Sequence, residues 1–380
     1  MTGALAGIRV LDLSRLLPGP FCSMILADHG AEVIALEDGT RETGEIFFNG
    51  VNRNKRHISL NLKTEAGKAI FFKLARRADI ILEGFRPGVV KRLGVDYEAV
   101  KAINPGIIYC SITGYGQTGP LKDAVGHDVN YLSHAGILDL MGDADRPPSI
   151  PGIQLADIAG GAMNAALGIL LALEARHRTG EGQYIDISMT DGVAGFLILP
   201  RFFQQLFGMA QTRSATMLSH RYACYNTYET RDGQYLALGA VEAVFWARLC
   251  RCLDRPDYIP LQYDEARREE IIAWLREVFK GEDAAHWEES LGQEEICLTR
   301  VKTLDQALDS ALFREREMVT ELVGENGKTV PTMGIPIKLS RTPGSLRSPP
   351  EDFGESTDAV LTELGYGPEE IAAFRRNQVI

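Results

Sequence analysis

Side chains that can move protons stand at three places in this chain. His127 and Asp128 are neighbours in a Gly-His-Asp-Val-Asn-Tyr segment, and Asp157 follows thirty residues after the histidine. Glu242 lies far downstream, in a Gly-Ala-Val-Glu segment. Histidine, aspartate and glutamate can take a proton from carbon or return it near neutral pH. With 51 acidic residues in the chain, most acids must be solvated, so the sequence context has to distinguish a site from the surface.

Each of these residues also has an ordinary structural interpretation. A histidine such as His127 can be a hydrogen-bonded core residue. Asp157 precedes an apolar helix, where aspartate is a favoured N-cap. Glu242 precedes an amphipathic segment and can be a first-turn acid that interacts with the helix dipole. Capping and catalysis are compatible, so these alternatives do not exclude a site.

Length and composition limit the class of protein. A chain of 380 residues predicts two domains, and 45% hydrophobic with 24% charged residues is typical of a globular protein. The net charge of −11 argues against a nucleic-acid surface. The richest apolar run, 158–173, is short for a membrane helix, and the N-terminus lacks a signal-peptide pattern, so we expect a cytoplasmic protein without a membrane partner. The six cysteines have no zinc-type spacing, and we expect no metal.

The first part of the chain alternates between strand and helix patterns. Buried strands are expected at 8–13, 31–36, 79–83 and 107–112, with helices at 18–29 and 65–77. Strands separated by helices of this length predict right-handed crossovers and a parallel sheet, whose ligands bind at the carboxyl ends of the strands. The turn after the first strand reads Leu-Pro-Gly-Pro, which is no dinucleotide fingerprint, so NAD and FAD are disfavoured.

Later segments predict a central helix and a second domain. Small residues recur along 157–177, which is typical of a helix packed closely among others, and a strand follows at 183–188. A hairpin with its turn at 231–234 and amphipathic helices at 245–253 and 265–279 predict a smaller α+β domain. We therefore expect a large Rossmann-like α/β domain over 1–220, a small domain over 221–325, and a tail over 326–380.

Several motifs together resemble the family III CoA transferases, and within them the α-methylacyl-CoA racemase branch. The resemblance covers essentially the whole chain. Its most specific motif is Thr-Gly-Glu-Gly-Gln-Tyr, and the racemase branch is indicated by the His127-Asp128 pair, which true transferases usually lack, and by Glu242. The other matching motifs lie at 7–12, 30–34, 52–56, 83–88, 114–120, 179–184, 354–358 and 364–366.

The resemblance implies an interlocked homodimer that binds acyl-CoA as its substrate and uses no further cofactor. The implied reaction inverts the α-carbon of 2-methylacyl-CoA thioesters through an enolate. His127 is then the base on one face of that carbon and Asp157 the base on the other. Backbone N–H groups at the helix start beside Asp157 are expected to hold the enolate oxygen. Glu242 is expected to orient His127, and Asp128 to shape the network.

Two other functions remain open. In a CoA transferase, Asp157 attacks the thioester and carries first the acyl group and then CoA between carboxylic acids. A non-catalytic CoA-binding scaffold is the third possibility, although His127, Asp157 and Glu242 are all present. A racemase needs one substrate, whereas a transferase needs a donor and an acceptor acid.

Binding of CoA requires cations for its phosphates. Arg86 and Arg92 match the family positions, and Arg53 and Lys55 cluster upstream with Arg56, although that cluster can also be a solvated turn. Relatives usually place an arginine after the second strand, where this chain has Asp38. Arg41, three residues on, is the expected substitute.

Overall fold

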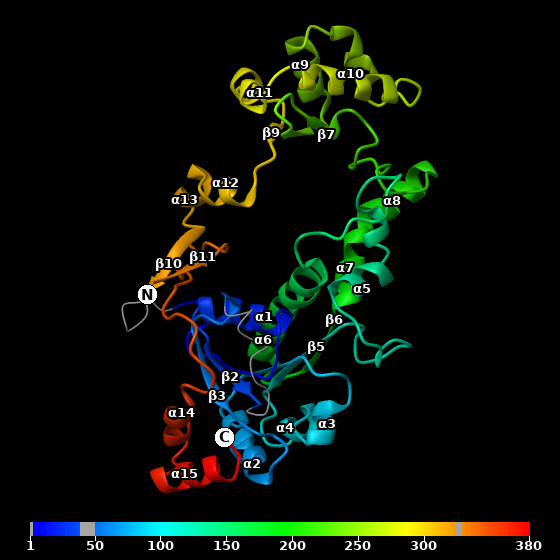
Figure 1. Ribbon diagram of the computed structural model, residues 1–380. Coiled ribbons are helices and arrows are strands. Elements are labelled where there is room, and N and C mark those ends of the chain that lie inside the picture. Colours follow the sequence, from blue (N-terminus) through cyan, green and yellow to red (C-terminus); the bar gives the residue numbers. More distant parts are fainter. Residues whose placement is uncertain (1–2, 39–49, 324–328) are drawn as a thin grey trace. The chain divides into compact units, whose positions relative to one another are not determined.

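A computed structural model describes residues 3–38, 50–323 and 329–380 of the chain (Figure 1). The chain divides into two compact units, each with its own core. Unit 1 comprises Met1–Ala135, Pro151–Phe196 and Ala311–Ile380, and unit 2 comprises Gly136–Ile150 and Leu197–Ser310. The predicted boundaries at residues 220 and 325 both differ from this division, because 197–220 group with the second unit and 311–323 with the first.

Unit 1 is built on a six-stranded sheet with the order β3-β2-β1-β4-β5-β6, and every pair of neighbouring strands is parallel. The predicted parallel α/β fold is therefore confirmed. The first predicted strands and helices agree with the structure to within about two residues, but β3 was not predicted. The strands are β1 (Arg9–Asp12), β2 (Glu32–Glu37), β3 (Lys55–Ser59), β4 (Ile80–Glu83), β5 (Ile108–Thr113) and β6 (Tyr184–Ser188).

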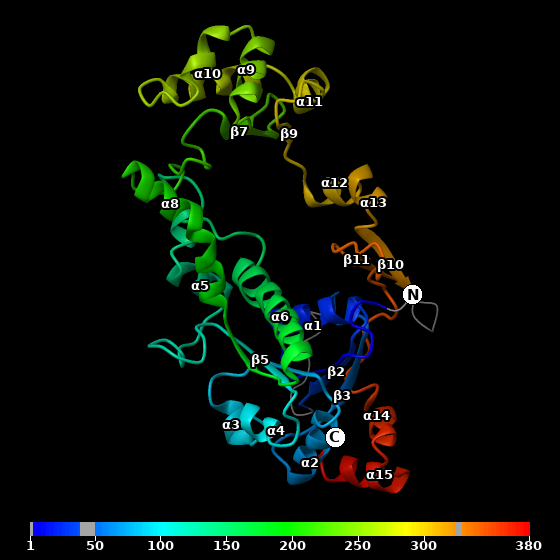
Figure 2. The same cartoon turned by 180° about the vertical axis from the view of Figure 1, so that it is seen from behind.

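Helices cover both faces of this sheet (Figures 1 and 2). One face packs against α1 (Pro18–Asp28) and α6 (Asn164–Thr179). The other carries α2 (Glu65–Ala75), α3 (Val89–Leu93), α4 (Tyr97–Lys101), α14 (Thr357–Glu363) and α15 (Pro368–Arg376). Helix α2 starts where Thr64 accepts a hydrogen bond from the Gly67 N–H, and its side chains Ile70 and Phe71 are completely buried against the sheet. The strands are buried on both faces, which explains their nearly continuous apolar sequences.

The predicted central helix is longer than its sequence pattern suggested. It begins as a π-helical segment, η3 (Ala156–Met163), and continues directly into α6. Its glycines allow close packing, because a Cβ on Gly160 would lie 2.6 Å from the Met189 carbonyl oxygen of α7 (Met189–Ala194). Over Ala156–Thr179 the helix is long and apolar enough to cross a membrane by length and composition alone, and half of its most apolar window is buried inside the protein.

Unit 2 contains a three-stranded antiparallel sheet made by β7 (Tyr225–Glu229), β8 (Tyr235–Gly239) and β9 (Leu298–Arg300). The predicted hairpin and both amphipathic helices are confirmed. One face of the sheet packs on a core of Tyr228, Leu236, Trp246 and Phe279, to which the helices contribute. The helices of this core are α9 (Ala243–Cys252), α10 (Arg268–Lys280) and α11 (Ala284–Leu291).

The remaining elements connect or flank these layers. In unit 1 they are α5 (Asp128–His134), α13 (Ala311–Glu315) and the antiparallel pair β10 (Val319–Val323) and β11 (Thr329–Met333). In unit 2 they are η2 (Leu138–Leu140), α8 (Ile198–Phe207), η5 (Pro256–Leu261) and α12 (Leu304–Leu308). The short turn η4 (Gly195–Leu197) spans the boundary.

The C-terminal tail covers the free edge of β3. The side-chain oxygen of Asn54 accepts hydrogen bonds from the backbone N–H groups of Arg347 (2.6 Å) and Ser348 (3.1 Å). Further along, the His57 N–H donates to Glu351 and the His57 carbonyl accepts from the Ser356 N–H. An edge strand with unpaired polar groups is a site for unwanted pairing, so the tail satisfies groups that would otherwise face solvent or another chain.

A buried ion pair holds the start of β3 in place. Arg53 donates to both carboxylate oxygens of Asp28 (3.1 and 2.7 Å), and both side chains are about 3% exposed. We expect Arg53→Met to lower the free energy of unfolding by about 3 kcal/mol, because it leaves the Asp28 charge buried without its partner. Urea unfolding followed by circular dichroism measures this change.

The matched control is Arg9→Met, which removes an exposed pair with Glu32 at 3.0 Å. It is expected to cost less than about 1 kcal/mol. Equal effects of the two substitutions would contradict a structural role of the Arg53–Asp28 pair.

Candidate active site

The predicted acid-base residues of unit 1 lie beyond the carboxyl end of β5. The chain leaves β5 at Thr113, passes through a glycine-rich turn, and reaches α5 at Asp128. Both the backbone N–H and the hydroxyl of Thr190 donate to the Gly114 carbonyl, which joins this turn to α7. A Cβ on Gly114 would lie 2.3 Å from the ring of Tyr131, so glycine is needed for the ring to pack there.

The backbone of His127 is held by two neighbours in its own motif. The Asn130 side chain accepts a hydrogen bond from the His127 N–H at 3.0 Å. The Tyr131 hydroxyl donates to the Gly126 carbonyl at 2.5 Å. The ring of Tyr131 also packs edge-on against Tyr115. These contacts fix the start of α5 while the His127 side chain remains exposed, as a base that meets a substrate must be.

Asp128 joins α5 to the long helix that carries Asp157. One of its carboxylate oxygens accepts hydrogen bonds from the N–H groups of Ala156 (2.6 Å) and Asp157 (3.0 Å). The next N–H, of Ile158, donates to the Gln154 carbonyl. The expectation that N–H groups at this helix start hold an enolate oxygen is therefore wrong for these three residues, because each already has an acceptor.

Asp157 is half-buried and has a perturbed acidity. Burial, together with the nearby charge of Asp128, raises its pKa from an ordinary 3.8 to about 6, and His127 acts in the opposite direction. The electrostatic interaction places His127, Asp128 and Asp157 in one cluster. A carboxylate with this pKa is a stronger base than an ordinary aspartate and is still largely ionised at neutral pH.

Tyr131 belongs to the same cluster, although the sequence analysis gave it no role. Burial raises the pKa of its hydroxyl to about 12, and Asp157 is the first charge that adds to this shift. The charge of Arg86 opposes it, so the turn after β4 also lies within electrostatic range. Tyr131 ends the Gly-His-Asp-Val-Asn-Tyr segment, and this position beside His127 and Asp128 was the sequence feature that could have predicted its role.

Glu242 lies in the second unit, where it is exposed at the N-cap of α9. Its carboxylate contributes to raising the pKa of Tyr263, after burial and Cys224, to about 12. The predicted orientation of His127 by Glu242 stays a prediction.

The predicted cations fall into two groups. Arg86 and Arg92 are exposed, on the turn after β4 and in α3, where a phosphate can reach them. Arg53 and Lys55 are buried, and this favours a structural role over the predicted phosphate contact. Lys55 donates to the Pro20 carbonyl at 2.8 Å, and burial lowers its pKa to about 8. Because Arg53 and Lys55 are buried, the alternative that this cluster is a solvated turn is wrong.

Asp38, at the end of β2, lies close to two cations. Arg15 approaches its carboxylate to 3.7 Å and Lys63 to 3.5 Å. The proposed substitute Arg41 lies outside the described residues. The acidic residue at this position is thus embedded among positive charges, which lessens its repulsion of an anionic ligand.

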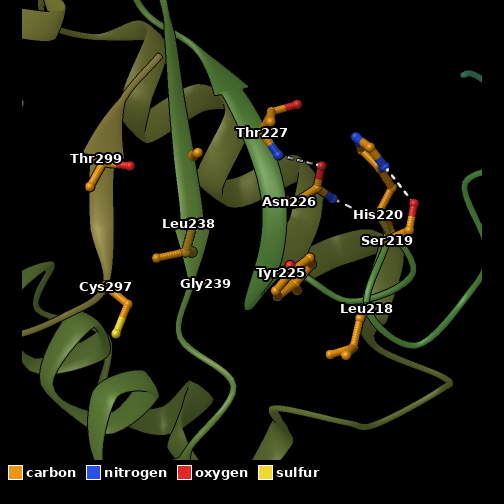
Figure 3. A pocket seen from close by; sticks show the side chains of 11 residues that line it. Leu218, Ser219, His220, Tyr225, Asn226, Thr227, Leu238, Gly239, Cys297 and Thr299 are labelled. Carbon is orange, nitrogen blue, oxygen red and sulfur yellow. Dashed lines mark hydrogen bonds between the residues drawn. The ribbon is translucent and has the colours of Figure 1, made fainter. Parts of the chain in front are cut away.

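Unit 2 has a cavity of its own beside its three-stranded sheet (Figure 3). Its volume is about 330 Å³, and its lining includes Tyr225, Ala237, Gly239 and Cys297. Asn226 donates to the His220 carbonyl at 3.2 Å, and the Ser219 hydroxyl lies 3.1 Å from His220 Nδ1. The lining contains no carboxylate, lysine or arginine, so this cavity suits an uncharged group better than a phosphate.

Unit 1 thus combines a six-stranded parallel α/β sheet with a cluster of acid-base side chains beyond the carboxyl end of β5, as in an enzyme that transfers protons or acyl groups. Residues 5–357 match the model of CoA-transferase family III, and the chain belongs to that family. It is an enzyme of this family, either a racemase or a CoA transferase, and the predicted resemblance is confirmed.

Similar proteins include both kinds of enzyme. An alpha-methylacyl-CoA racemase of Mus musculus is 36% identical over 99% of this chain and 97% of its own length. An acetyl-CoA:oxalate CoA-transferase of Acetobacter aceti is 34% identical over 89% of this chain and 90% of its own. A CAIB/BAIF family protein of Brucella suis has a solved structure with a TM-score of 0.82 and 29% identity, over 96% of this chain and 100% of that one.

The raised pKa of Asp157 predicts how its substitution changes stability with pH. Burial opposes the ionisation of Asp157 in the folded protein, so above pH about 6 the charged carboxylate lowers the free energy of unfolding. The protonated carboxyl group has no such effect. Asp157→Asn is therefore expected to stabilise the protein at pH 8 by about 1 kcal/mol, after allowance for partial solvent screening. The difference is expected to shrink at pH 4.

Thermal unfolding midpoints at the two pH values measure this effect. Asp145→Asn, on an exposed turn, is the control and should change neither midpoint. A variant at Asp157 that is less stable than the natural protein at pH 8 would show that its charge is stabilising, contrary to the burial argument.

Proposed function

We propose that this protein is an acyl-CoA racemase that inverts the α-carbon of 2-methylacyl-CoA thioesters. The observation that carries the proposal is the cluster of an exposed His127 with a half-buried Asp157 of raised pKa. Two bases of different kinds near one substrate carbon are what inversion by proton exchange requires. The full-length similarity to alpha-methylacyl-CoA racemases of Mus musculus and Homo sapiens supports the same reaction.

In the proposed reaction, one base removes the α-proton while the C–H electron pair forms the double bond of an enolate. The thioester carbonyl oxygen takes the negative charge. The conjugate acid of the other base then returns a proton to the opposite face, which inverts the centre. Asp157 suits the first or the second step, because a pKa of about 6 lets it both accept and donate near neutral pH.

A CoA transferase is the alternative, and the similarity to the enzyme of Acetobacter aceti favours keeping it. In that reaction the Asp157 carboxylate attacks the thioester carbonyl, and CoA leaves as the thiolate. CoA then attacks the resulting anhydride at the aspartyl carbonyl and releases the first carboxylate. A second carboxylic acid is needed for the return step, whereas inversion needs none.

Isotope exchange distinguishes the two reactions. One stereoisomer of a 2-methylacyl-CoA, incubated with the protein in D2O, is expected to lose its α-hydrogen signal in proton NMR and its optical purity together. His127→Ala and Asp157→Ala are each expected to slow inversion at least about a hundredfold, because inversion needs a base on each face of the α-carbon. For the stereoisomer whose proton Asp157 removes, the carboxyl must be ionised, so the rate should rise as the pH passes about 6.

His177→Ala, an exposed histidine on α6, is the control and should exchange at the natural rate. Absence of exchange with several acyl chains, together with CoA transfer to an added carboxylic acid, would reject the racemase and support the transferase.

We also propose that the protein acts as a homodimer. Four apolar side chains on one side of the long helix are exposed at spacings of four, three and one residues, namely Met163, Leu167, Leu170 and Leu171. An apolar stripe of this kind is usually buried in an interface.

Substitution within this stripe tests the dimer. Leu167→Glu is expected to shift the mass measured by light scattering from two chains to one, because a charge in an apolar interface is costly. Arg178→Glu, on the same helix and exposed, should leave the mass unchanged. A natural protein that already has the mass of one chain would contradict the proposal.

A further inference from the structure

The backbone directly before Glu242 is held by side chains from a segment twenty residues further along the chain. Gln262 is buried, and its amide nitrogen donates hydrogen bonds to the carbonyl oxygens of Ala240 (3.0 Å) and Val241 (2.7 Å). The hydroxyl of Tyr263 donates to the same Val241 oxygen at 2.6 Å. Three hydrogen bonds from two neighbouring residues thus converge on the two carbonyls that precede Glu242.

The orientation of the Gln262 amide follows from its partners. A backbone carbonyl only accepts hydrogen bonds, so the amide atom that faces both carbonyls must be the nitrogen, which carries two N–H groups. Each of these N–H groups then has one acceptor. The amide does not titrate, so Gln262 holds both carbonyls at any pH at which the protein is folded.

Glu242 is held on its other side by the start of α9. Its carbonyl oxygen accepts a hydrogen bond from the Trp246 N–H at 3.2 Å. The indole of Trp246 is completely buried and donates to the carbonyl of Tyr258 at 3.0 Å, in the turn η5 that ends just before Gln262. One stretch of chain, 256–263, therefore fixes the backbone on both sides of Glu242.

Helix capping does not account for the side chain of Glu242. Glutamate is not a favoured N-cap residue, and at the N-cap of α9 its exposed carboxylate makes no capping hydrogen bond among the residues that the structure describes. After burial and Cys224, the charge of Glu242 adds to the raised pKa of Tyr263, so the carboxylate lies within electrostatic range of that hydroxyl. An exposed carboxylate on a firmly held backbone suits a group that must meet another group at a set place.

We propose that Gln262 and Tyr263 are positioning residues, which hold the Ala240–Val241 backbone so that the Glu242 carboxylate keeps a fixed place during inversion. The inference rests on the proposed function and on the predicted part of Glu242 in it. A displacement of about 1 Å can cost an enzyme about a hundredfold in rate. A loosened loop would therefore slow inversion although neither Gln262 nor Tyr263 needs to touch the substrate.

Removal of single hydroxyl groups tests the inference with little disturbance of the fold. Tyr263→Phe keeps the ring that packs edge-on against Tyr222, and we expect kcat for inversion to fall about five- to tenfold with KM nearly unchanged. Tyr228→Phe is the matched control, because it removes a hydroxyl that donates to the Ala223 carbonyl at 2.7 Å in the same unit. It should lower the unfolding midpoint but keep the natural kcat. No loss of kcat in Tyr263→Phe, or an equal loss in both variants, would overturn the inference.

A double-substitution cycle separates positioning from general damage. Gln262→Met removes both amide donors at nearly the same side-chain length, and we expect kcat to fall about ten- to a hundredfold. In protein that already carries Glu242→Ala, the same substitution should lower kcat no further, because its effect acts through Glu242. The rates are referred to folded protein, measured by circular dichroism. Losses that multiply in the double variant would show that Gln262 acts on the fold in general, and would overturn the inference.

The natural protein and Glu242→Ala distinguish failure of the inference from failure of the function. Inversion by the natural protein, with a large loss of kcat in Glu242→Ala, is the result that we expect. Inversion at the natural rate in Glu242→Ala would overturn the inference alone and leave the racemase standing. Absence of inversion by the natural protein with several acyl chains would reject the function and the inference together.

Discussion

The carboxylate of Asp128 holds the two halves of the acid-base cluster together. It accepts the first two N–H groups of the helix that begins at Ala156, and it lies one residue from His127. The same negative charge adds to the burial that raises the pKa of Asp157. A single hydrogen-bonding group thus anchors a helix and adjusts the basicity of a neighbour. This coupling explains why a residue that need not touch a substrate matters for the chemistry we propose.

Close packing of glycines brings the helix to that carboxylate. Gly160 and Gly161 lie against α7, and a Cβ on Gly192 would come within 2.2 Å of the Gly160 carbonyl oxygen. This close approach coincides with a π-helical segment. Such segments are rare in proteins, and those that occur are often found at functional sites. The small residues that make the helix look central in the sequence therefore serve to place Asp157 beyond the carboxyl edge of the sheet, where doubly wound folds bind ligands.

Some cations of unit 1 form buried ion pairs, and others are exposed where a ligand can reach them. Arg53 and Lys55 neutralise Asp28 and Asp12 inside the protein, which leaves the exposed Arg86 and Arg92 as the better candidates for phosphate. The tail that covers β3 takes part in this division, because it holds Asn54 and the Glu37–His57 pair in place.

The sequence by itself determined the parallel α/β fold, the family, and His127, Asp128 and Asp157 as candidates for one site, since apolar runs and local motifs are properties of short segments. It did not reveal β3, because the run Lys-Arg-His-Ile-Ser looks like a solvated cation cluster until Asp12 and Asp28 are brought to it. The sequence also suggested that the N–H groups at the helix start are available to a ligand, whereas in the tertiary structure two of them donate hydrogen bonds to Asp128. Burial and hydrogen-bond partners depend on residues distant in the chain. Only the tertiary structure therefore decides which charged side chains form buried ion pairs and which stay exposed to a ligand.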